Sequence, residues 1–395
     1  MTTPRYRRTA SLSAVSLGLL LLVSACSTAP RPASWPSPKA SGAAASGRIQ
    51  RATGTVPTVP TVSRPWRPGL RQLGIEVYWT ANTHDSATVI RAKARRIINY
   101  AISLNANSIG VSFPFYTYGI TSSTVYASQD STPSPADIGI FLSEAAKSRM
   151  RVTLRPILNE NILVAQNPRA WRGSIEPAEP GAWFWSYREL LTPYAEAAQS
   201  GHAATFVIGT ELNSLQGDPN WSGLVAAIRA VYHGQLAYDE NFDDFAAHDK
   251  DLPLPVFGVD AYPPFDLPDG TSVDELARAW EGWLGTHTLA VRRNVILYEV
   301  GIAAVPGSYP DPGAWLTTTR APIDLAVQTR WFEAACRAVA AESIGGVYWW
   351  EVSFDADPAH PSPYQSDRLT FLGRPAQDVI RNCFASLSSG KPPSR

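Results

Sequence analysis

Two glutamates near the ends of apolar segments are the clearest candidates for chemistry in this chain of 395 residues. The segment Phe206–Leu212 carries Glu211, and the segment Val295–Gly301 carries Glu299. Each segment is a nearly continuous apolar run, which is typical of a strand buried on both faces, and an ionised carboxylate at its tip costs free energy unless it has partners or a function. Two such glutamates on different strands of one barrel would supply the acid and the nucleophile of glycoside hydrolysis. The alternative is that each one caps its strand or pairs with a neighbouring arginine.

The elements that must position these glutamates alternate between short apolar runs and longer amphipathic stretches. The predicted strands are Leu73–Trp79, Ser108–Phe115, Arg151–Leu158, Thr205–Leu212, Gln235–Asn241, Val256–Tyr262, Val295–Gly301 and Gly346–Val352. The predicted helices are Ala87–Leu104, Pro135–Ser148, Trp183–Gln199, Ser222–Tyr232, Val273–Leu289, Leu325–Ala341 and Pro375–Phe384, with a short one near Phe242–His248. Serial strand–helix units argue for parallel strands joined by right-handed crossovers. The sequence therefore predicts an α/β fold, a single (β/α)8 TIM barrel without a second domain.

Polar and aromatic residues gather at the predicted C-terminal ends of the strands, where the active sites of such barrels lie. The candidate substrate-binding residues there are Tyr78, Trp79, Arg155, Asn159, Asn213, Asp239, Asp260, Tyr262, Trp349 and Trp350. We expect two aromatic pairs to offer stacking platforms for sugar rings: Tyr78 with Trp79, and Trp349 with Trp350. Tyr78 or Trp350 could instead pack outward against helices, and Arg155 could serve only to neutralise buried carboxylates. The long loops Thr117–Ser134, Asn159–Pro180 and Ala303–Thr319 are expected on the same side and could close the cleft.

Short motifs around the two glutamates resemble a known enzyme family. Gly-Thr-Glu-Leu around Glu211 and Tyr-Glu-Val-Gly around Glu299 are similar to glycoside hydrolase family 113, the β-mannanase-like group of clan A, and the resemblance spans about Leu73 to Phe384. It implies an acid/base at the end of the fourth strand and a nucleophile at the end of the seventh, where Glu211 and Glu299 stand. Many clan members carry an asparagine before the acid/base to hold the sugar 2-hydroxyl, but this chain has Thr210. Recognition of that hydroxyl would then shift to Asn213 or another rim residue.

The resemblance also implies an activity and its chemistry. We expect a retaining glycoside hydrolase that acts on β-linked polysaccharide or oligosaccharide, with β-1,4-mannan favoured, by a double displacement at Glu211 and Glu299. Tyr262 could donate its hydroxyl to Glu299, and apolar burial together with the charge of Glu299 should raise the pKa of Glu211. No cofactor is required.

Two alternatives from other functional classes stay open, and neither of them is catalytic. One is a solute-binding surface lipoprotein that feeds a transporter, although such proteins have two lobes and a hinge rather than eight serial strand–helix units. The other is a silent barrel that only binds glycan or scaffolds the envelope, against which the two intact glutamates weigh.

The N-terminal residues predict export and a lipid anchor. Residues 1–25 read as a signal peptide, with a basic start at Arg5, Arg7 and Arg8 and an apolar stretch, Leu12–Val23, too short to span a membrane. It runs into Val-Ser-Ala-Cys at residues 23–26, which resembles the bacterial lipobox and makes Cys26 the expected lipidation site. An ordinary signal peptide with an incidental cysteine is the alternative. We expect a Pro/Ala/Ser-rich disordered tether over 26–69, a catalytic domain over 70–386 and a disordered tail over 387–395, in a monomeric membrane lipoprotein facing the extracellular side.

Composition and cysteine content limit the remaining possibilities. Formal net charge is +0, so there is no basic footprint for nucleic acid, and the 13 Trp and 15 Tyr suit glycan binding but also suit a core. Beyond Cys26 the chain has Cys336 and Cys383, one on each of the last two predicted helices. They could form a disulfide in an oxidising compartment, or remain thiols if the geometry forbids it. No CxxC or HExxH pattern occurs and the six histidines show no ligand spacing, so no metal is expected.

Overall fold

The computed structural model describes residues 59–247, 252, 254, 257–314, 321–362 and 368–389. Cys26, the signal segment and most of the predicted tether lie outside the described residues. From Val59 onward the chain forms one compact unit. Among the helices that the structure describes, none combines the length and the apolar character needed to cross a membrane.

Eight parallel strands close into a barrel, as the sequence predicted. These strands are β1 (Gln72–Tyr78), β2 (Ser108–Thr117), β4 (Arg151–Leu158), β5 (Thr205–Thr210), β6 (Gln235–Asn241), β7 (Phe257–Asp260), β8 (Ile296–Val300) and β9 (Gly346–Ser353). Each pairs in parallel with its neighbours, and β1 pairs with both β2 and β9, which closes the sheet. A two-residue strand that the sequence did not indicate, β3 (Val125–Tyr126), pairs antiparallel with the end of β2. The (β/α)8 barrel is therefore confirmed, with a small hairpin added at its C-terminal rim.

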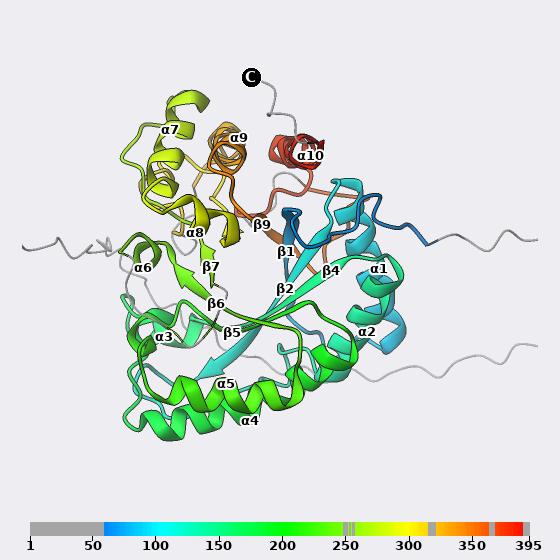
Figure 1. Cartoon of the computed structure of the whole chain (residues 1–395), viewed down its shortest axis with the longest axis vertical. Helices are drawn as coiled ribbons and strands as arrows, with labels where there is room; N and C mark the ends of the chain where they lie inside the picture. The colour runs from blue at the N-terminus through cyan, green and yellow to red at the C-terminus, as the bar shows by residue number, and fades with distance from the viewer. Residues whose placement is uncertain are drawn as a thin grey trace, which may run out of the picture. The chain divides into compact units, whose positions relative to one another are not determined.

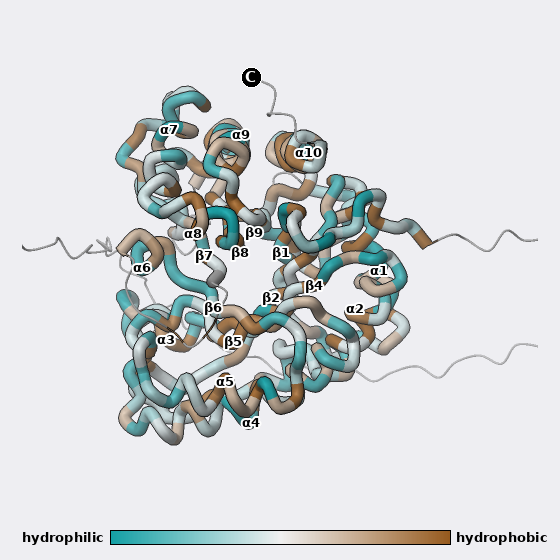
Figure 2. The backbone as a smooth tube through the Cα atoms, in the orientation of Figure 1, coloured by the Kyte–Doolittle hydropathy of each residue, from teal (hydrophilic) through white to brown (hydrophobic). Residues whose placement is uncertain are grey.

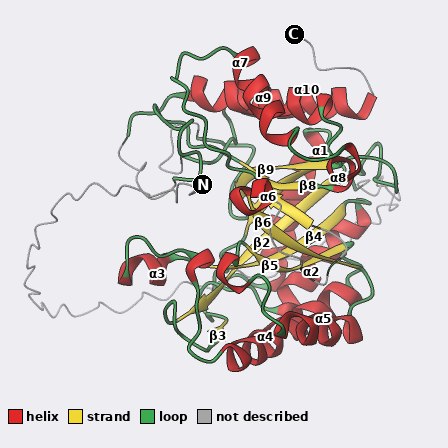
Figure 3. Cartoon of the chain, turned by 60° about the vertical axis from the view of Figure 1, so that its left-hand side comes forward, coloured by secondary structure: helices red, strands yellow, loops and turns green. Residues whose placement is uncertain are grey.

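Helices surround the barrel strands (Figures 1 and 3). The longer ones are α1 (Ala87–Ser103), α2 (Pro135–Lys147), α4 (Pro180–Ser200), α5 (Asn220–Val231), α7 (Val273–Leu284), α9 (Leu325–Ala341) and α10 (Pro375–Ser389). The short ones are α3 (Asn161–Gln166), α6 (Phe242–Ala247), α8 (Leu289–Asn294) and the 3-10 turns η1 (Arg172–Ser174) and η2 (Asn213–Leu215). Ser86, Ser134 and Ser272 start three of them by accepting a backbone N–H of the first turn. Along α4 and α5 the tube in Figure 2 alternates between hydrophobic and hydrophilic colours, which is typical of helices with one buried face.

Three boundaries differ from the sequence-based expectation. The helix predicted over 273–289 is two helices, because α7 ends at Leu284 and Thr288 caps a new one by accepting the N–H of Val291. Helix α10 runs to Ser389, into the residues expected as a tail, and Leu387 on it is buried. Residues 59–69, expected in the tether, contact the domain: buried Val62 donates its N–H to the Ser148 carbonyl at 3.0 Å.

The barrel interior is packed by large side chains that face glycines. A Cβ atom on Gly110 would lie 1.7 Å from Oε1 of Glu76, and one on Gly258 would lie 1.9 Å from the ring of Tyr298. Both glycines are needed because these neighbours occupy the space where a side chain would go. The interior is thus a filled core rather than a pore, as expected for this fold.

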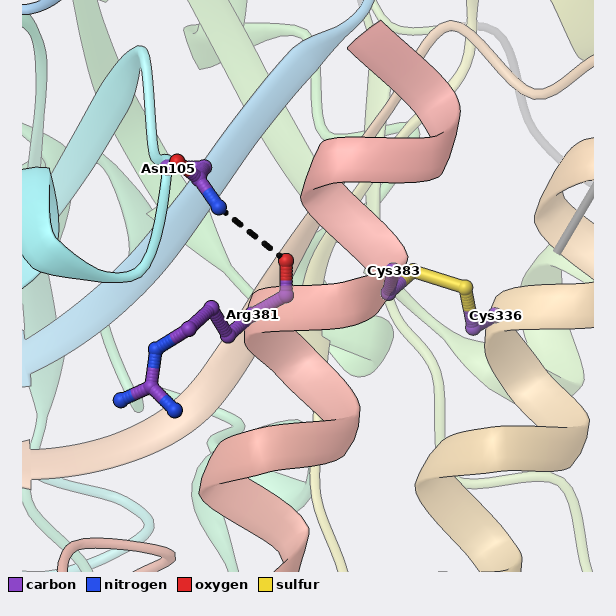
Figure 4. The surroundings of a disulfide bond; sticks show 4 residues. All are labelled: Asn105, Cys336, Arg381 and Cys383. Carbon is purple, nitrogen blue, oxygen red and sulfur yellow. Dashed lines mark hydrogen bonds between the residues drawn. A yellow bond between two sulfur atoms is a disulfide. The ribbon is translucent and has the colours of Figure 1, made fainter. Parts of the chain in front are cut away.

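A disulfide joins the last two helices (Figure 4). Cys336 on α9 and Cys383 on α10 form the bridge considered from the sequence, with their Cα atoms 6.0 Å apart. On the other side of α10, Asn105 donates its side-chain amide to the carbonyl of Arg381 at 3.3 Å. Helix α10 is therefore held by a covalent bond to α9 and by a polar contact to the turn after α1.

Candidate active site

Glu211 follows the last residue of β5 and has an unusual backbone. Its φ is +51°, a left-handed conformation that is uncommon for a residue other than glycine and often marks functional sites. Its N–H donates to the Asp239 carbonyl at 2.8 Å, and the N–H of Leu212 donates to the Tyr238 hydroxyl at 2.8 Å. These bonds fix the turn, so that the carboxyl group of Glu211 is held in place while only 8% of the residue is exposed.

Glu299 lies on β8 and receives a hydrogen bond on each carboxyl oxygen. Nη1 of Arg155 donates to Oε1 at 2.9 Å, and the hydroxyl of Tyr262 donates to Oε2 at 2.7 Å. Burial, and next the charge of Glu299, raises the pKa of Tyr262 well above its ordinary value, so this hydroxyl keeps its proton and remains a donor. Each oxygen of the Glu299 carboxyl group therefore has a donor, and one of the two donors is cationic. The hydrogen bond expected from Tyr262 is present.

Arg155 is the centre of a buried ionic cluster. It is 0% exposed and donates to Asp239 Oδ2 at 2.7 Å and to Asp260 Oδ1 at 2.7 Å, besides its bond to Glu299. A fourth carboxylate, that of Glu76 on β1, lies 3.5 Å from Nη1. Because Arg155, Asp239 and Asp260 are fully buried, they cannot touch substrate, which corrects their assignment as substrate-binding residues. The alternative weighed for Arg155, neutralisation of carboxylates, describes its contacts.

One cation cannot neutralise four carboxylates, and the carboxyl groups respond by holding protons. Burial raises the pKa of Glu76 to about 8, with Arg155 opposing and Glu299 adding to the rise. Burial raises the pKa of Asp239 to about 7, and it raises the pKa of Asp260 well above its ordinary value. The cluster therefore keeps part of its protons near neutral pH, and its net negative charge stays small.

Glu211 has a different partner, which the sequence reasoning missed. Nη1 of Arg172, on η1, donates to Oε2 of Glu211 at 2.6 Å. Arg172 is fixed in turn by Nε donating to the Leu158 carbonyl at 3.0 Å and by its N–H donating to Oε1 of Glu160 at 3.2 Å. Burial raises the pKa of Glu211 to about 8 against the lowering effect of Arg172, and the charge of Glu299 adds to the rise. In the sequence, the only indication that Arg172 could reach the site was its position in the long loop Asn159–Pro180, which was expected at the rim.

Besides Tyr262, four of the predicted rim residues reach the surface. Tyr78 and Trp350 are half-buried and meet edge to face with ring centroids 5.8 Å apart, and Asn159 donates its amide to the Tyr78 hydroxyl at 3.3 Å. Burial raises the pKa of Tyr78 to about 12, with smaller effects from Asn159, Glu351 and Arg172, which places Tyr78 in the same electrostatic environment as Arg172. Asn213 is half-buried on η2, and its amide faces Asp243 Oδ1 at 3.5 Å.

Two predicted sugar platforms are core residues instead. Trp79 is 2% exposed and stacks on Phe354 with a centroid distance of 4.0 Å, and Trp349 is 0% exposed and packs on Phe332 of α9. Neither ring can present a face to a sugar, which corrects the prediction. Successive side chains on a strand point to opposite faces, so of the pair 349–350 only Trp350 turns toward the rim.

The hydroxyl of Thr210, which stands where many clan members have asparagine, also turns inward. Thr210 is 2% exposed, and its Oγ1 has no hydrogen-bond partner among the residues that the structure describes. A cavity of about 360 Å³ lies beside the rim, between the segments that follow β1 and β2, and neither glutamate lines it. Within the described ranges, no group of His, Cys, Asp and Glu is arranged to hold a metal ion.

A closed (β/α)8 barrel with buried glutamates at the ends of its fourth and seventh barrel strands is typical of a large class of glycoside hydrolases. The sequence profile of Glycoside Hydrolase Family 113 matches residues 79–368. The chain therefore belongs to glycoside hydrolase family 113 and is a glycoside hydrolase. No match was found among curated proteins.

Solved structures with the same fold include several mannan-degrading enzymes. The family 113 β-mannanase from Alicyclobacillus acidocaldarius superposes with a TM-score of 0.65 at 19% identity, over 80% of this chain and 98% of that one. A family 113 β-1,4-mannanase gives 0.66 at 19% identity, over 80% and 99%. The endo-β-1,4-mannanase from Thermotoga petrophila gives 0.51 at 12% identity, over 82% and 78%. At these identities the likeness is one of fold.

Proposed function

We propose that this glycoside hydrolase is a retaining β-mannanase in which Glu211 is the acid/base and Glu299 the nucleophile. The observation that carries the proposal is the contrast between the two carboxyl environments. Glu299 accepts hydrogen bonds from a cation and from a phenol, which suits an ionised nucleophile. Burial raises the pKa of Glu211 to about 8, which suits an acid that must hold a proton at neutral pH. Carboxyl groups in such divided environments are the expected pair for acid and nucleophile roles.

The reaction then proceeds in two displacements. The Glu299 carboxylate attacks the anomeric carbon while Glu211 donates its proton to the glycosidic oxygen, so that the C–O bond breaks and a glycosyl ester forms on Glu299. Formation of the ester removes the negative charge of Glu299, and the pKa of Glu211 falls. The Glu211 carboxylate can now take a proton from water as the water oxygen attacks the same carbon and releases Glu299. Two inversions give net retention, which requires the carboxyl groups to lie about 5–5.5 Å apart.

Mannan is proposed as the substrate because of the family and its neighbours. The two family 113 structures with the same fold are described as β-mannanases. Tyr78, Trp350 and Asn159 offer aromatic and amide groups at the rim for a neutral sugar. We further propose that the protein is exported and anchored through Cys26, on the strength of its N-terminal sequence.

The test separates the two glutamates by their dependence on the leaving group. Glu299→Gln should abolish turnover of every substrate, because no glycosyl ester can form. Glu211→Ala should lose about 10²- to 10⁴-fold on mannooligosaccharides, the usual contribution of a general acid, but far less on aryl mannosides whose phenolate leaves without a proton. Azide should rescue Glu211→Ala on aryl mannosides and give a β-glycosyl azide.

The matched control is Glu189→Gln, the same chemical change at an exposed glutamate of α4, which should leave activity intact. A loss below about tenfold for Glu211→Ala on mannooligosaccharides would contradict its assignment as the acid. An inverted first product from the parent enzyme would contradict the retaining mechanism. If the parent binds mannan and cleaves neither substrate type, the chain is a binding protein and the hydrolytic proposal fails.

A further inference from the structure

Three tyrosines form a stacked row on the hairpin at the rim of the barrel. Tyr116, the last residue but one of β2, pairs with Tyr126 of β3, with ring centroids 5.7 Å apart and 29° between the rings. Tyr118 stacks on Tyr126 at 4.5 Å and 22°. We call these residues the tyrosine ladder (Tyr116, Tyr126 and Tyr118). Tyr118 is 60% exposed although it is a large aromatic residue, and gathered aromatic side chains of this kind mark interaction sites.

The hairpin has its own anchors and does not depend on the exposed ring. Oγ of Ser186 on α4 accepts the N–H of Val125 at 3.0 Å and donates to the Val125 carbonyl at 3.1 Å. Across the next loop, the N–H of Glu176 donates to the Ile120 carbonyl at 2.8 Å. The hairpin is therefore pinned to two other segments of the chain. A rigid support lowers the entropy lost on binding, so the ladder is organised before a ligand arrives.

The ladder continues the rim of the candidate active site. Tyr116 stands at the C-terminal end of a barrel strand, where active sites of this fold lie. Strands β1 and β2 pair in parallel with Tyr78 opposite Ser112, so Tyr116 lies farther along the neighbouring strand at the same end of the barrel. Tyr78 in turn meets Trp350 edge to face. Aromatic residues thus stand toward the C-terminal ends of three adjacent strands, with Trp350 on β9, Tyr78 on β1 and Tyr116 on β2.

The chemistry of the ladder fits an uncharged, hydroxylated ligand. The Tyr116 hydroxyl lies 2.7 Å from Oγ of Ser131, and the backbone carbonyl of Tyr118 accepts from the Gln166 amide at 2.6 Å. These partners are hydroxyl and amide groups rather than charged ones. An exposed phenol ring offers a flat apolar face with a hydroxyl at its edge. A pyranose ring has the complementary C–H face and hydroxyl rim.

We propose that the tyrosine ladder is an accessory binding site for a distal segment of the same β-linked glycan that is cleaved beside Glu211 and Glu299. The proposal rests on the proposed function and extends it: the substrate is a chain long enough to reach from the two glutamates to the exposed ring of Tyr118.

The experiment compares ligands of two lengths in Tyr118→Ala and Tyr118→Phe. Binding of mannobiose and mannohexaose is measured by calorimetry in the Glu299→Gln background, and kcat/KM is measured for mannohexaose and an aryl mannoside in the active enzyme. Tyr118→Ala should weaken mannohexaose binding about 2- to 10-fold, the range for one aromatic contact. It should lower the ratio of kcat/KM on mannohexaose to kcat/KM on the aryl mannoside by a similar factor. Tyr118→Phe, which keeps the ring, should retain most of both.

The control is Leu289→Ala, which removes a side chain of similarly exposed apolar character from α8 (43% exposed) and should change neither quantity. Two results in Tyr118→Ala would contradict the proposed role of the tyrosine ladder: equal weakening of mannobiose and mannohexaose binding, or unchanged mannohexaose binding. If the parent cleaves mannooligosaccharides while either result is obtained, the proposed function stands and only the ladder fails. If the parent cleaves no glycan but Tyr118→Ala weakens binding of mannohexaose alone, the proposed function fails and the ladder stands as a glycan site.

Discussion

Replacement of Arg172 by methionine should move the alkaline limb of the pH–rate profile to higher pH. Arg172 Nη1 lies 2.6 Å from Glu211 Oε2, and the two side chains are 16% and 11% exposed, so solvent screens the pair only partly. An arginine beside a carboxyl group typically lowers its pKa by about 1–3 units. The pKa of Glu211 is about 8 with Arg172 in place, and it rises further when the cation is removed. Glu160, 3.4 Å from Nε of Arg172, would also lose this neutralising charge, and its negative charge would then raise the pKa of Glu211 further.

The sign follows from the role proposed for Glu211. A general acid is active while protonated, so kcat/KM falls as pH rises through the pKa of Glu211 in the free enzyme. Arg172→Met should therefore shift the midpoint of this fall upward by about 1–3 pH units. The assay is kcat/KM on mannooligosaccharides from about pH 5 to about pH 11, a range that covers the pKa of about 8 and the expected upward shift.

Two variants separate charge from position. Arg172→Lys keeps the cation and should shift the limb less, even if its lost hydrogen bonds lower the rate. Arg169→Met removes an exposed positive charge from the same loop and should leave the limb in place. A lower rate in Arg172→Met with an unmoved limb would mean that Arg172 only positions the loop, and a limb moved to lower pH would refute the electrostatic reasoning.

Three further predictions concern stability and location. Replacing Cys336 and Cys383 by serine opens a loop with a sequence separation of 47 and should lower the free energy of unfolding by roughly 4 kcal/mol in urea titrations; a change below about 1 kcal/mol would refute the chain-entropy argument. Because the pKa of Glu76 rises from 4.5 to about 8 on folding, the stability from its bound proton is present at acid pH and is lost as pH rises through that window. In Glu76→Gln the side chain at position 76 cannot titrate. The melting temperature of this variant should therefore fall less than that of the parent as the pH rises from 4.5 to about 8. An equal fall in both proteins would contradict the raised pKa of Glu76. Cys26→Ser should move the protein from membranes to the soluble exported fraction, and continued membrane association after processing would contradict the anchor.

The fold and the position of the two glutamates could be predicted because both depend on short-range pattern. Continuous apolar runs identify strands buried on both faces, and the barrel follows from their alternation with helices. Glu211 and Glu299 stood out because a carboxylate beside such a run is unusual. The contact between Tyr262 and Glu299 could be foreseen because neighbouring parallel strands bring their ends together.

The remaining parts of the site depend on long-range geometry that a pattern does not contain. Arg172 reaches Glu211 from a loop 39 positions away, and no local feature distinguishes it from Arg169. Trp79 and Trp349 looked like sugar platforms because composition does not say which way a ring points at the end of a strand. The tyrosine ladder depends on a two-residue strand, too short to show any periodicity.

The shared arginine in the barrel interior restricts the order in which this protein could change over generations. The carboxyl groups of Glu76, Asp239 and Asp260 hold protons readily, so an amide can replace one of them with little change in the charge that surrounds Arg155. Loss of Arg155 first would leave buried acids without their cation, which is strongly destabilising. One of these acids can therefore be replaced while Arg155 is present, whereas replacement of Arg155 while all the acids remain is destabilising, and substitutions at these positions are not independent. A double-mutant cycle between Arg155 and Asp260 measures this dependence directly for one pair: additive effects would mean that these two positions change independently.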